Sequence, residues 1–137
     1  KAEEHHLSVV SDQDLLLVKA DARLVVQVIV NLVDNAVKYT EPGSTITVIT
    51  RACGEMAEVS VADNGGGIPD QEKEKIFEKF YCGTRKIADN RRSLGLGLFL
   101  CKAIVEAHGG TIQVADNQPR GTLFRFFLPL EEVTFYE

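Results

Sequence analysis

The stretch NLVDNAVKYT, residues 31–40, is the one from which the rest of the fold can be inferred. It ends a helical pattern that begins near residue 21 and closes near residue 39. At about 100° per residue, the polar side chains of this helix gather in one arc narrower than about a third of a turn, and apolar side chains fill most of the remainder. The arc contains Gln27, Asn31, Asp34, Asn35 and Lys38. A helix that is apolar over most of its circumference is buried, so its polar arc must face a cavity, a ligand or solvent.

The chemistry of this arc suits two kinds of ligand. Amide oxygens can coordinate a metal ion, and a lysine ammonium can pair with a phosphate. The alternative is a half-exposed polar face on an amphipathic helix, which is the commoner case for a helix considered alone. The segments that follow in the chain decide between these readings.

Composition limits the class of protein. The chain has 137 residues, of which 45% are hydrophobic and 26% are charged, as expected for one globular domain spanning 1–137. The net charge of −5 offers no general attraction for nucleic acid or anionic lipid, so we expect neither a nucleic-acid partner nor direct membrane contact. No apolar run approaches the roughly 18 residues that cross a membrane.

The termini and cysteines add two expectations. Residues 1–6 are polar and no apolar segment follows them, so we interpret them as a flexible leader and not as a signal peptide. The three cysteines, Cys53, Cys82 and Cys101, are odd in number and widely spaced. This pattern predicts reduced thiols in a cytoplasmic setting and argues against a disulfide framework or a zinc site.

The pattern of elements predicts an α+β fold, a two-layer α/β sandwich in which a mixed, mostly antiparallel sheet carries helices on one face. Alternating and β-branched segments predict the strands, apolar periodicity predicts the helices, and glycine or proline punctuates both. The expected strands are residues 7–10, 15–18, 44–52, 58–62, 111–115 and 122–128, and the expected helices are residues 21–39, 70–80 and 96–108. Residues 81–94 are polar and basic without periodicity, which indicates a mobile loop.

Two glycine-rich segments could approach a nucleotide. In residues 63–68, DNGGGI, an aspartate ends a strand and could accept a hydrogen bond from an exocyclic amine, while the glycines let backbone come close to a ring or a phosphate. In residues 93–98, SLGLGL, the loop opens a helix whose free amides could bind an anion. Each motif alone is more often an ordinary turn or helix junction. The usual P-loop and dinucleotide-binding motifs are absent from the sequence.

The order of the motifs is more specific than any one of them. The blocks NLVDNAVKYT, DNGGGI, IFEKFY, GLGL and AIVEAHGGTI occur in this order, and Gly121-Thr122 precedes the last strand. This combination resembles the catalytic ATP-binding domain of sensor histidine kinases, within the superfamily that includes DNA gyrase and mismatch-repair ATPases. The similarity covers about residues 7–130 and is greatest to the KdpD-type potassium-responsive sensors.

The resemblance implies ATP and Mg²⁺ as cofactors and assigns roles to individual residues. Asn35 would coordinate the Mg²⁺, Lys38 would pair with a phosphate, and Asp63 would accept from the adenine amino group. Phe77 and Phe80 would form a hydrophobic hinge for an ATP lid at residues 81–94, although two phenylalanines at helical spacing more often belong to a core. The implied ATP-binding residues are Asn31, Asn35, Lys38, Tyr39, Asp63, Gly65, Gly67, Ile68, Phe80, Arg85, Gly95, Leu96, Gly97, Leu98 and Thr122.

Position 31 bears on the mechanism. Related hydrolytic ATPases carry a glutamate there as a base, whereas Asn31 is an amide that cannot take up a proton at neutral pH. This favours phosphoryl transfer over water attack. No segment like H-x-L-[RK]-T-P is present, so the acceptor histidine would lie on a separate dimerisation domain of the same parent protein, through which a response regulator would be reached. The parent would be a membrane-bound bacterial sensor with this domain in the cytoplasm.

Three positions depart from the family pattern. Cys82 stands where an arginine usually follows Phe-Tyr, Ser93 replaces the first glycine of the lid motif, and Gly66 stands where proline is common. These departures leave open a nucleotide-binding regulatory or interaction module with weak or no transfer. A self-sufficient ATPase of the gyrase type is a third alternative, which Asn31 argues against. His108, in the His-Gly-Gly block, is expected to be structural.

Overall fold

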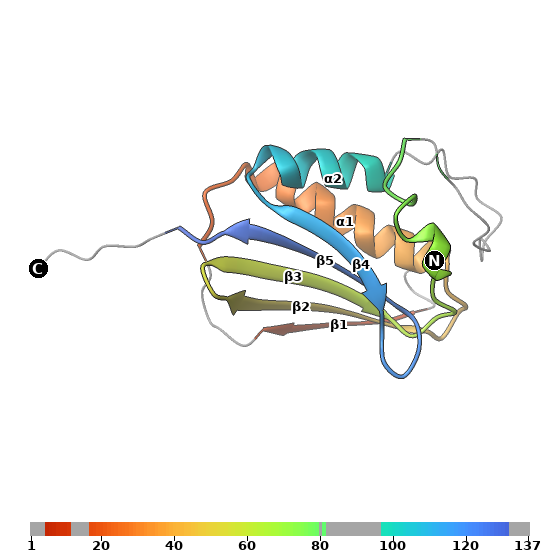
Figure 1. Ribbon diagram of the computed structural model, residues 1–137. Coiled ribbons are helices and arrows are strands. Elements are labelled where there is room, and N and C mark those ends of the chain that lie inside the picture. Colours follow the sequence, from red (N-terminus) through yellow and green to blue (C-terminus); the bar gives the residue numbers. More distant parts are fainter. Residues whose placement is uncertain (1–4, 12–16, 80, 82–96, 132–137) are drawn as a thin grey trace, which may run out of the picture.

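The fold is a five-stranded sheet covered by two helices (Figure 1). A computed structural model describes residues 5–11, 17–79, 81 and 97–131. Its elements in chain order are β1 (His6–Ser11), α1 (Ala22–Lys38), β2 (Thr45–Cys53), β3 (Met56–Asp63), the 3₁₀ turn η2 (Asp70–Glu72), α2 (Gly97–Ala107), β4 (Thr111–Asp116) and β5 (Thr122–Pro129). Figure 1 shows α1 and α2 side by side on the same face of the sheet, as the sequence predicts.

The sheet is mixed, which confirms the predicted fold class. Its strand order is β1-β2-β3-β5-β4. β1 pairs in parallel with β2, and the other three pairs are antiparallel. A parallel pair needs a crossover connection, and α1 lies in the segment that supplies it between β1 and β2. Short connections join β2 to β3 and β4 to β5, whereas η2 and α2 lie between β3 and β4.

The core lies between the helices and the sheet. Strand β5 alternates strictly, with Phe124, Phe126 and Leu128 each at most 4% exposed. From α1, Val28 and Leu32 reach the same layer and are almost wholly buried. Burying a side chain of this size contributes about 1.5–3 kcal/mol. This packing fixes which face of α1 is buried, and so which face carries the polar arc.

Strand β1 is covered much less than its neighbour. Its register places Leu7 opposite Ile46 and Val9 opposite Val48, so these side chains share the helix-side face of the sheet. Ile46 and Val48 are buried, whereas Leu7 is 57% and Val9 70% exposed. Among the described residues, the two helices therefore cover β2 but not β1.

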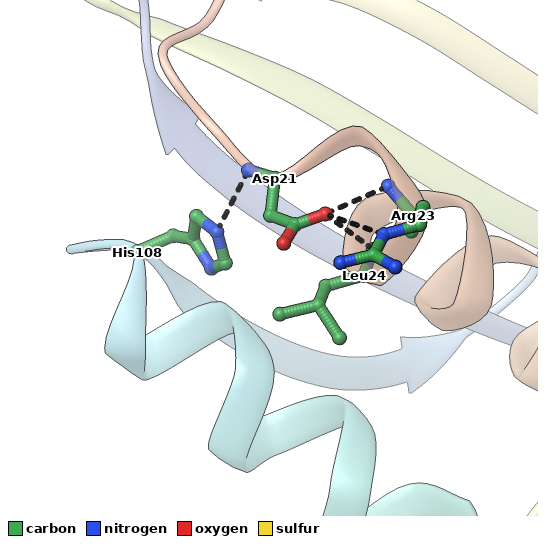
Figure 2. Close-up of polar contacts among 4 residues, drawn as sticks. All are labelled: Asp21, Arg23, Leu24 and His108. Atoms are coloured by element: carbon green, nitrogen blue, oxygen red, sulfur yellow. Dashed lines mark hydrogen bonds and ion pairs between the residues drawn. The ribbon is translucent and has the colours of Figure 1, made fainter.

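The start of α1 is tied to the end of α2 (Figure 2). The Asp21 carboxylate caps α1 by accepting from the amides of Arg23 and Leu24. The Asp21 amide donates to His108 Nε2 at 3.1 Å, and His108 Nδ1 lies 2.8 Å from the Ile104 carbonyl. Because Nε2 accepts, Nδ1 carries the proton and donates to Ile104. His108 thus has the structural role expected from the sequence.

Two sequence predictions of secondary structure are wrong in part. Residues 70–80 do not form a continuous helix. The 3₁₀ turn η2 is followed by separate turns, in which the Glu78 amide donates to the Lys75 carbonyl, and the buried side chains of Glu72 and Ile76 hold the segment against the domain. Tertiary packing here overrides local helical preference. In the expected strand at 15–18, Val18 forms only an isolated bridge with Leu130, and residues 15 and 16 lie outside the described part.

The first of the two expected hinge phenylalanines belongs to the core. The Phe77 ring packs edge-on against Phe124 with centroids 6.1 Å apart. This contact supports the core reading over the hinge reading for Phe77. Phe80 lies outside the described residues.

Candidate functional site

A pocket of about 800 Å³ opens at the end of β3, beside the C-terminus of α1. Three parts of the chain line it: residues 39–44 after α1, residues 63–69 after β3, and Arg120 with Thr122 at the start of β5. The predicted site residues that line this pocket are Tyr39, Asp63, Gly65, Gly67, Ile68 and Thr122. The fold therefore brings the DNGGGI block and Gly121-Thr122 together from positions more than 50 residues apart.

Asp63 is the anchor of the pocket. It ends β3 and is 5% exposed, and its Oδ1 accepts from the Gly65 amide at 2.9 Å and the Thr122 amide at 3.2 Å. Two amide donors favour the ionised carboxylate and fix its orientation. The family resemblance implied support of Asp63 by Thr122 through a water molecule, whereas in the structure the Thr122 backbone amide contacts the carboxylate directly. A buried, oriented carboxylate is suited to accept a hydrogen bond from an amino group of a ligand.

Glycine is required where the pocket loops meet. A Cβ on Gly121 would lie 2.0 Å from the Asp63 carbonyl oxygen, and its φ is +108°, so only glycine fits both the space and the conformation. A Cβ on Gly65 would lie 2.6 Å from Thr40 Cγ2. These close approaches bring the start of β5 and the end of α1 against the 63–67 loop.

Thr40 closes the wall that faces Gly65. It is buried, its hydroxyl donates to the Ala36 carbonyl at 2.7 Å, and His5 Nε2 lies 2.9 Å from the same hydroxyl oxygen. The sequence predicted His5 and His6 to lie in a flexible leader, whereas in the structure His6 begins β1 and His5 contacts Thr40, for which no role was predicted. Thr40 ends the NLVDNAVKYT block, and its position directly after the helix was the only signal available for it.

Sequence reasoning also missed the loop between β4 and β5. Asn117 Nδ2 donates to the Asp63 carbonyl at 2.8 Å, and Arg120 Nε donates to the Gly65 carbonyl at 2.9 Å. Neither residue belongs to a motif, so their adjacency to Gly121-Thr122 was the only indication. Both hold backbone of the pocket loop.

The polar arc of α1 lies near the pocket, but among the described residues that line the pocket there is no Asn31, Asn35 or Lys38. Lys38 Nζ pairs with Asp34 Oδ2 at 3.1 Å. Asn31 faces α2, where burial raises the pKa of the Cys101 thiol to about 12 and a hydrogen bond from the Asn31 side chain opposes that rise. Asn31, Asn35 and Lys38 are half-buried. Their assigned contacts with metal and phosphate remain predictions.

The donor set of this arc fits Mg²⁺ bound with a nucleotide. The described residues contain no group of three or more His, Cys, Asp or Glu side chains that could hold a metal ion. Magnesium, however, keeps several waters and takes one or two protein oxygens together with substrate phosphates. The half-buried Asn35 can offer one amide oxygen from α1. The ion would then depend on the phosphates for most of its ligands.

The predicted lid is described only at its edges. Phe80, Arg85, Gly95 and Leu96 lie outside the described residues, and so do Cys82 and Ser93. Gly97 and Leu98 form the start of α2, where Leu98 is buried. At the other edge, the Tyr81 hydroxyl donates to Glu72 at 2.9 Å, and this bond raises the pKa of the tyrosine.

Gly66 offers a simple test of loop stiffness. A Cβ there would meet nothing within 4 Å, and its φ lies outside the left-handed range. We expect Gly66→Ala to raise the free energy of unfolding by about 0.4–1 kcal/mol, because it restricts the unfolded chain without native strain. Urea unfolding monitored by circular dichroism measures the change. Gly67→Ala, at φ +83°, is the matched control and should lower stability instead.

Comparison with known proteins places this pocket in a family. The model for the histidine kinase-, DNA gyrase B- and HSP90-like ATPases matches residues 20–132. The chain belongs to this ATPase family. The matched range includes α1, the pocket loops and β5, so the family assignment rests on the elements that build the site.

The relatives of this ATPase domain are bacterial sensor kinases. It is 39% identical to the sensor protein KdpD of Clostridium acetobutylicum over 93% of this chain and 14% of that protein. It is 42% identical to the sensory kinase SasA of Rippkaea orientalis over 93% of this chain and 33% of that protein. The chain thus spans about a seventh to a third of the curated relatives it matches. KdpD, which the sequence motifs resemble, is among these relatives.

Solved structures match the whole fold of the ATPase domain. The catalytic domain of the histidine kinase ThkA superposes with a TM-score of 0.81 at 32% identity, covering 93% of this chain and 80% of that domain. Another structure shows ThkA in complex with the response regulator TrrA, with a TM-score of 0.75 and coverage of 91% and 34%. The chain is therefore a histidine kinase catalytic ATPase domain. No helix among its described residues has the length and apolar character needed to cross a membrane.

Proposed function

We propose that the chain binds Mg-ATP and donates the γ-phosphoryl group to a histidine on a separate dimerisation domain of its parent protein. The observation that carries the proposal is Asp63, a buried carboxylate fixed by two backbone amides inside a pocket of about 800 Å³. Such a group accepts from the adenine amino group and is repelled by the carbonyl oxygen that guanine carries at the same position. It therefore selects ATP over GTP.

The chain's own residues would act by positioning and charge neutralisation. Asn35 would hold a magnesium ion, which supplies charge neutralisation at the phosphates when bound. Lys38, which now pairs with Asp34, would exchange that partner for a phosphate oxygen. Asn31 would orient these groups without abstracting a proton, since an amide is no base at neutral pH.

The adenine contact is tested by Asp63→Asn. We expect the affinity for ATP to fall about tenfold to a hundredfold and the preference over GTP to disappear, because the amide changes an acceptor into a mixed donor and acceptor. Calorimetric titration of both nucleotides with the wild type and the variant measures this. Glu41→Gln, which removes an exposed charge at the pocket rim, should leave the preference intact. Retained ATP preference in Asp63→Asn would contradict the adenine role.

The transfer step needs a partner. Mixing the chain with its cognate dimerisation domain and labelled ATP should produce acid-labile phosphohistidine on the partner. Complete absence of label at high concentrations of both domains would refute the transfer. By analogy with the ThkA–TrrA complex, we further propose that a response regulator receives the phosphoryl group through that domain. The parent would be a bacterial membrane sensor with this domain in the cytoplasm.

A second function is a nucleotide-binding regulatory or interaction module. The features that favour it are Cys82, which stands where the family usually carries an arginine, and Ser93 in the lid motif. In that case calorimetry would detect Mg-ATP binding without transfer. Recovery of transfer in Cys82→Arg would locate the defect at the lost arginine.

A further inference from the structure

The loop between β4 and β5, residues 117–121, is hydrogen-bonded to the loop at residues 63–67, which would hold the base. Asn117 Nδ2 donates to the Asp63 carbonyl, and Arg120 Nε donates to the Gly65 carbonyl. A backbone hydrogen bond joins the two ends of the 117–121 loop, because the Asn117 amide donates to the Gly121 carbonyl at 2.9 Å. Two side chains of one closed loop thus bind two carbonyls of the other, two residues apart.

These two hydrogen bonds hold the part of the pocket whose backbone has the greatest intrinsic conformational freedom. Residues 65–67 are three consecutive glycines, which lose more conformational freedom on ordering than any other residues. A loop that must be ordered by the ligand costs binding affinity, and a loop ordered beforehand does not. A hydrogen bond from a guanidinium to a carbonyl is stronger than one between neutral groups. Arg120 is exposed overall, yet its Nε donates a hydrogen bond to the Gly65 backbone carbonyl.

We propose that Arg120 and Asn117 are positioning residues that preorganise the 63–67 loop for the nucleobase, so that they set the affinity for adenine and not for the phosphates. The proposal rests on the nucleotide-binding function proposed above. It extends that function to two residues, Asn117 and Arg120, that belong to none of the family motifs seen in the sequence. Neither residue needs to touch the ligand for the effect.

A direct electrostatic role for Arg120 makes a different prediction. Arg120 lines the pocket and is a permanent cation, so it could also attract phosphates. Direct attraction weakens from ATP to ADP and vanishes for adenosine, which has no phosphate. Loop preorganisation acts equally on all three ligands because each carries the same base. The ligand series therefore separates the two roles.

The test titrates adenosine, ADP and ATP, with Mg²⁺ present, into the 137-residue chain and follows amide chemical shifts by NMR. We expect Arg120→Met to weaken all three ligands by the same factor, about tenfold, and Asn117→Ala to do so by about threefold to tenfold. Arg23→Met removes an equal charge at the far end of α1, where the side chain is 92% exposed, and should change none of the affinities.

Each other outcome is decisive. A loss confined to ADP and ATP would overturn preorganisation in favour of a phosphate contact, and unchanged affinities in both variants would overturn it outright. Arg120→Lys keeps the charge without the guanidinium geometry, so full recovery for ATP but not for adenosine would also count against the proposal. If the wild type binds none of the ligands, the proposed function itself fails, independently of the variants.

Discussion

Asn35→Ala abolishes magnesium-dependent ATP binding and leaves the fold intact. The variant removes the one amide oxygen that we assign to the metal. Loss of a residue that only hydrogen-bonds to a metal ligand typically lowers metal affinity by about tenfold to a hundredfold, so for the ligand itself we expect a loss of about a hundredfold or more. The fold survives because alanine favours helices and retains the backbone carbonyl that accepts from the Tyr39 amide. Calorimetry with ATP, with and without Mg²⁺, measures the loss.

The control for this variant lies on the same arc. Gln27→Ala removes an exposed amide two turns earlier on α1, and it should leave magnesium-dependent binding unchanged. The thermal unfolding midpoints of both variants should stay near that of the wild type. Unchanged Mg-ATP affinity in Asn35→Ala would show that the polar arc of α1 is an ordinary solvated face.

Gly121→Ala lowers stability and nucleotide binding together. The new Cβ would lie 2.0 Å from the Asp63 carbonyl oxygen and 2.9 Å from Asn64 Cα, so the two loops must move apart. Strain at this φ adds about 1–3 kcal/mol, and we expect a total loss of about 3 kcal/mol or more in the free energy of unfolding. Urea unfolding measures the first effect, and an ATP titration at low temperature measures the second.

Gly54 provides the matched comparison for the steric part. Its φ is also positive, at +62°, but a Cβ there meets nothing within 4 Å. Gly54→Ala should cost about 1 kcal/mol, from backbone conformation alone, and leave ATP binding unchanged. If Gly121→Ala were no worse than Gly54→Ala, the contact with Asp63 would not be tight.

The parts of the fold that follow from repeating patterns were predictable. The strict alternation of β5 around Phe124 and Phe126 gave a half-buried strand, and the long apolar helix closed by residues 41–43 gave α1. At residues 70–80 the same reasoning failed, because Glu72 and Ile76 are held by burial and not by a continuous helical ladder. Local pattern does not contain that tertiary information.

The candidate site likewise contains residues that the sequence predicts and residues that it does not. The positions of Asp63 and Gly65 were predictable because a chain reversal after a strand demands such residues, and the order of the motifs predicts a nucleotide as their ligand. Arg120 and Asn117 were not, because their function depends on how one loop lies against another. The predicted contacts of Asn31 and Lys38 with a nucleotide are still predictions, since in the structure these side chains meet Cys101 and Asp34.

Strand β1, at the edge of the sheet, is exposed along its whole length. It pairs only with β2 among the described residues, and the exposed Leu7 and Val9 contribute little to the core. Segments with few buried contacts open at a lower free energy than the whole protein unfolds. We therefore expect β1 to open at a lower free energy than the other four strands unfold. Because His5, directly before β1, contacts Thr40, opening of β1 would release one hydrogen bond at the wall of the pocket.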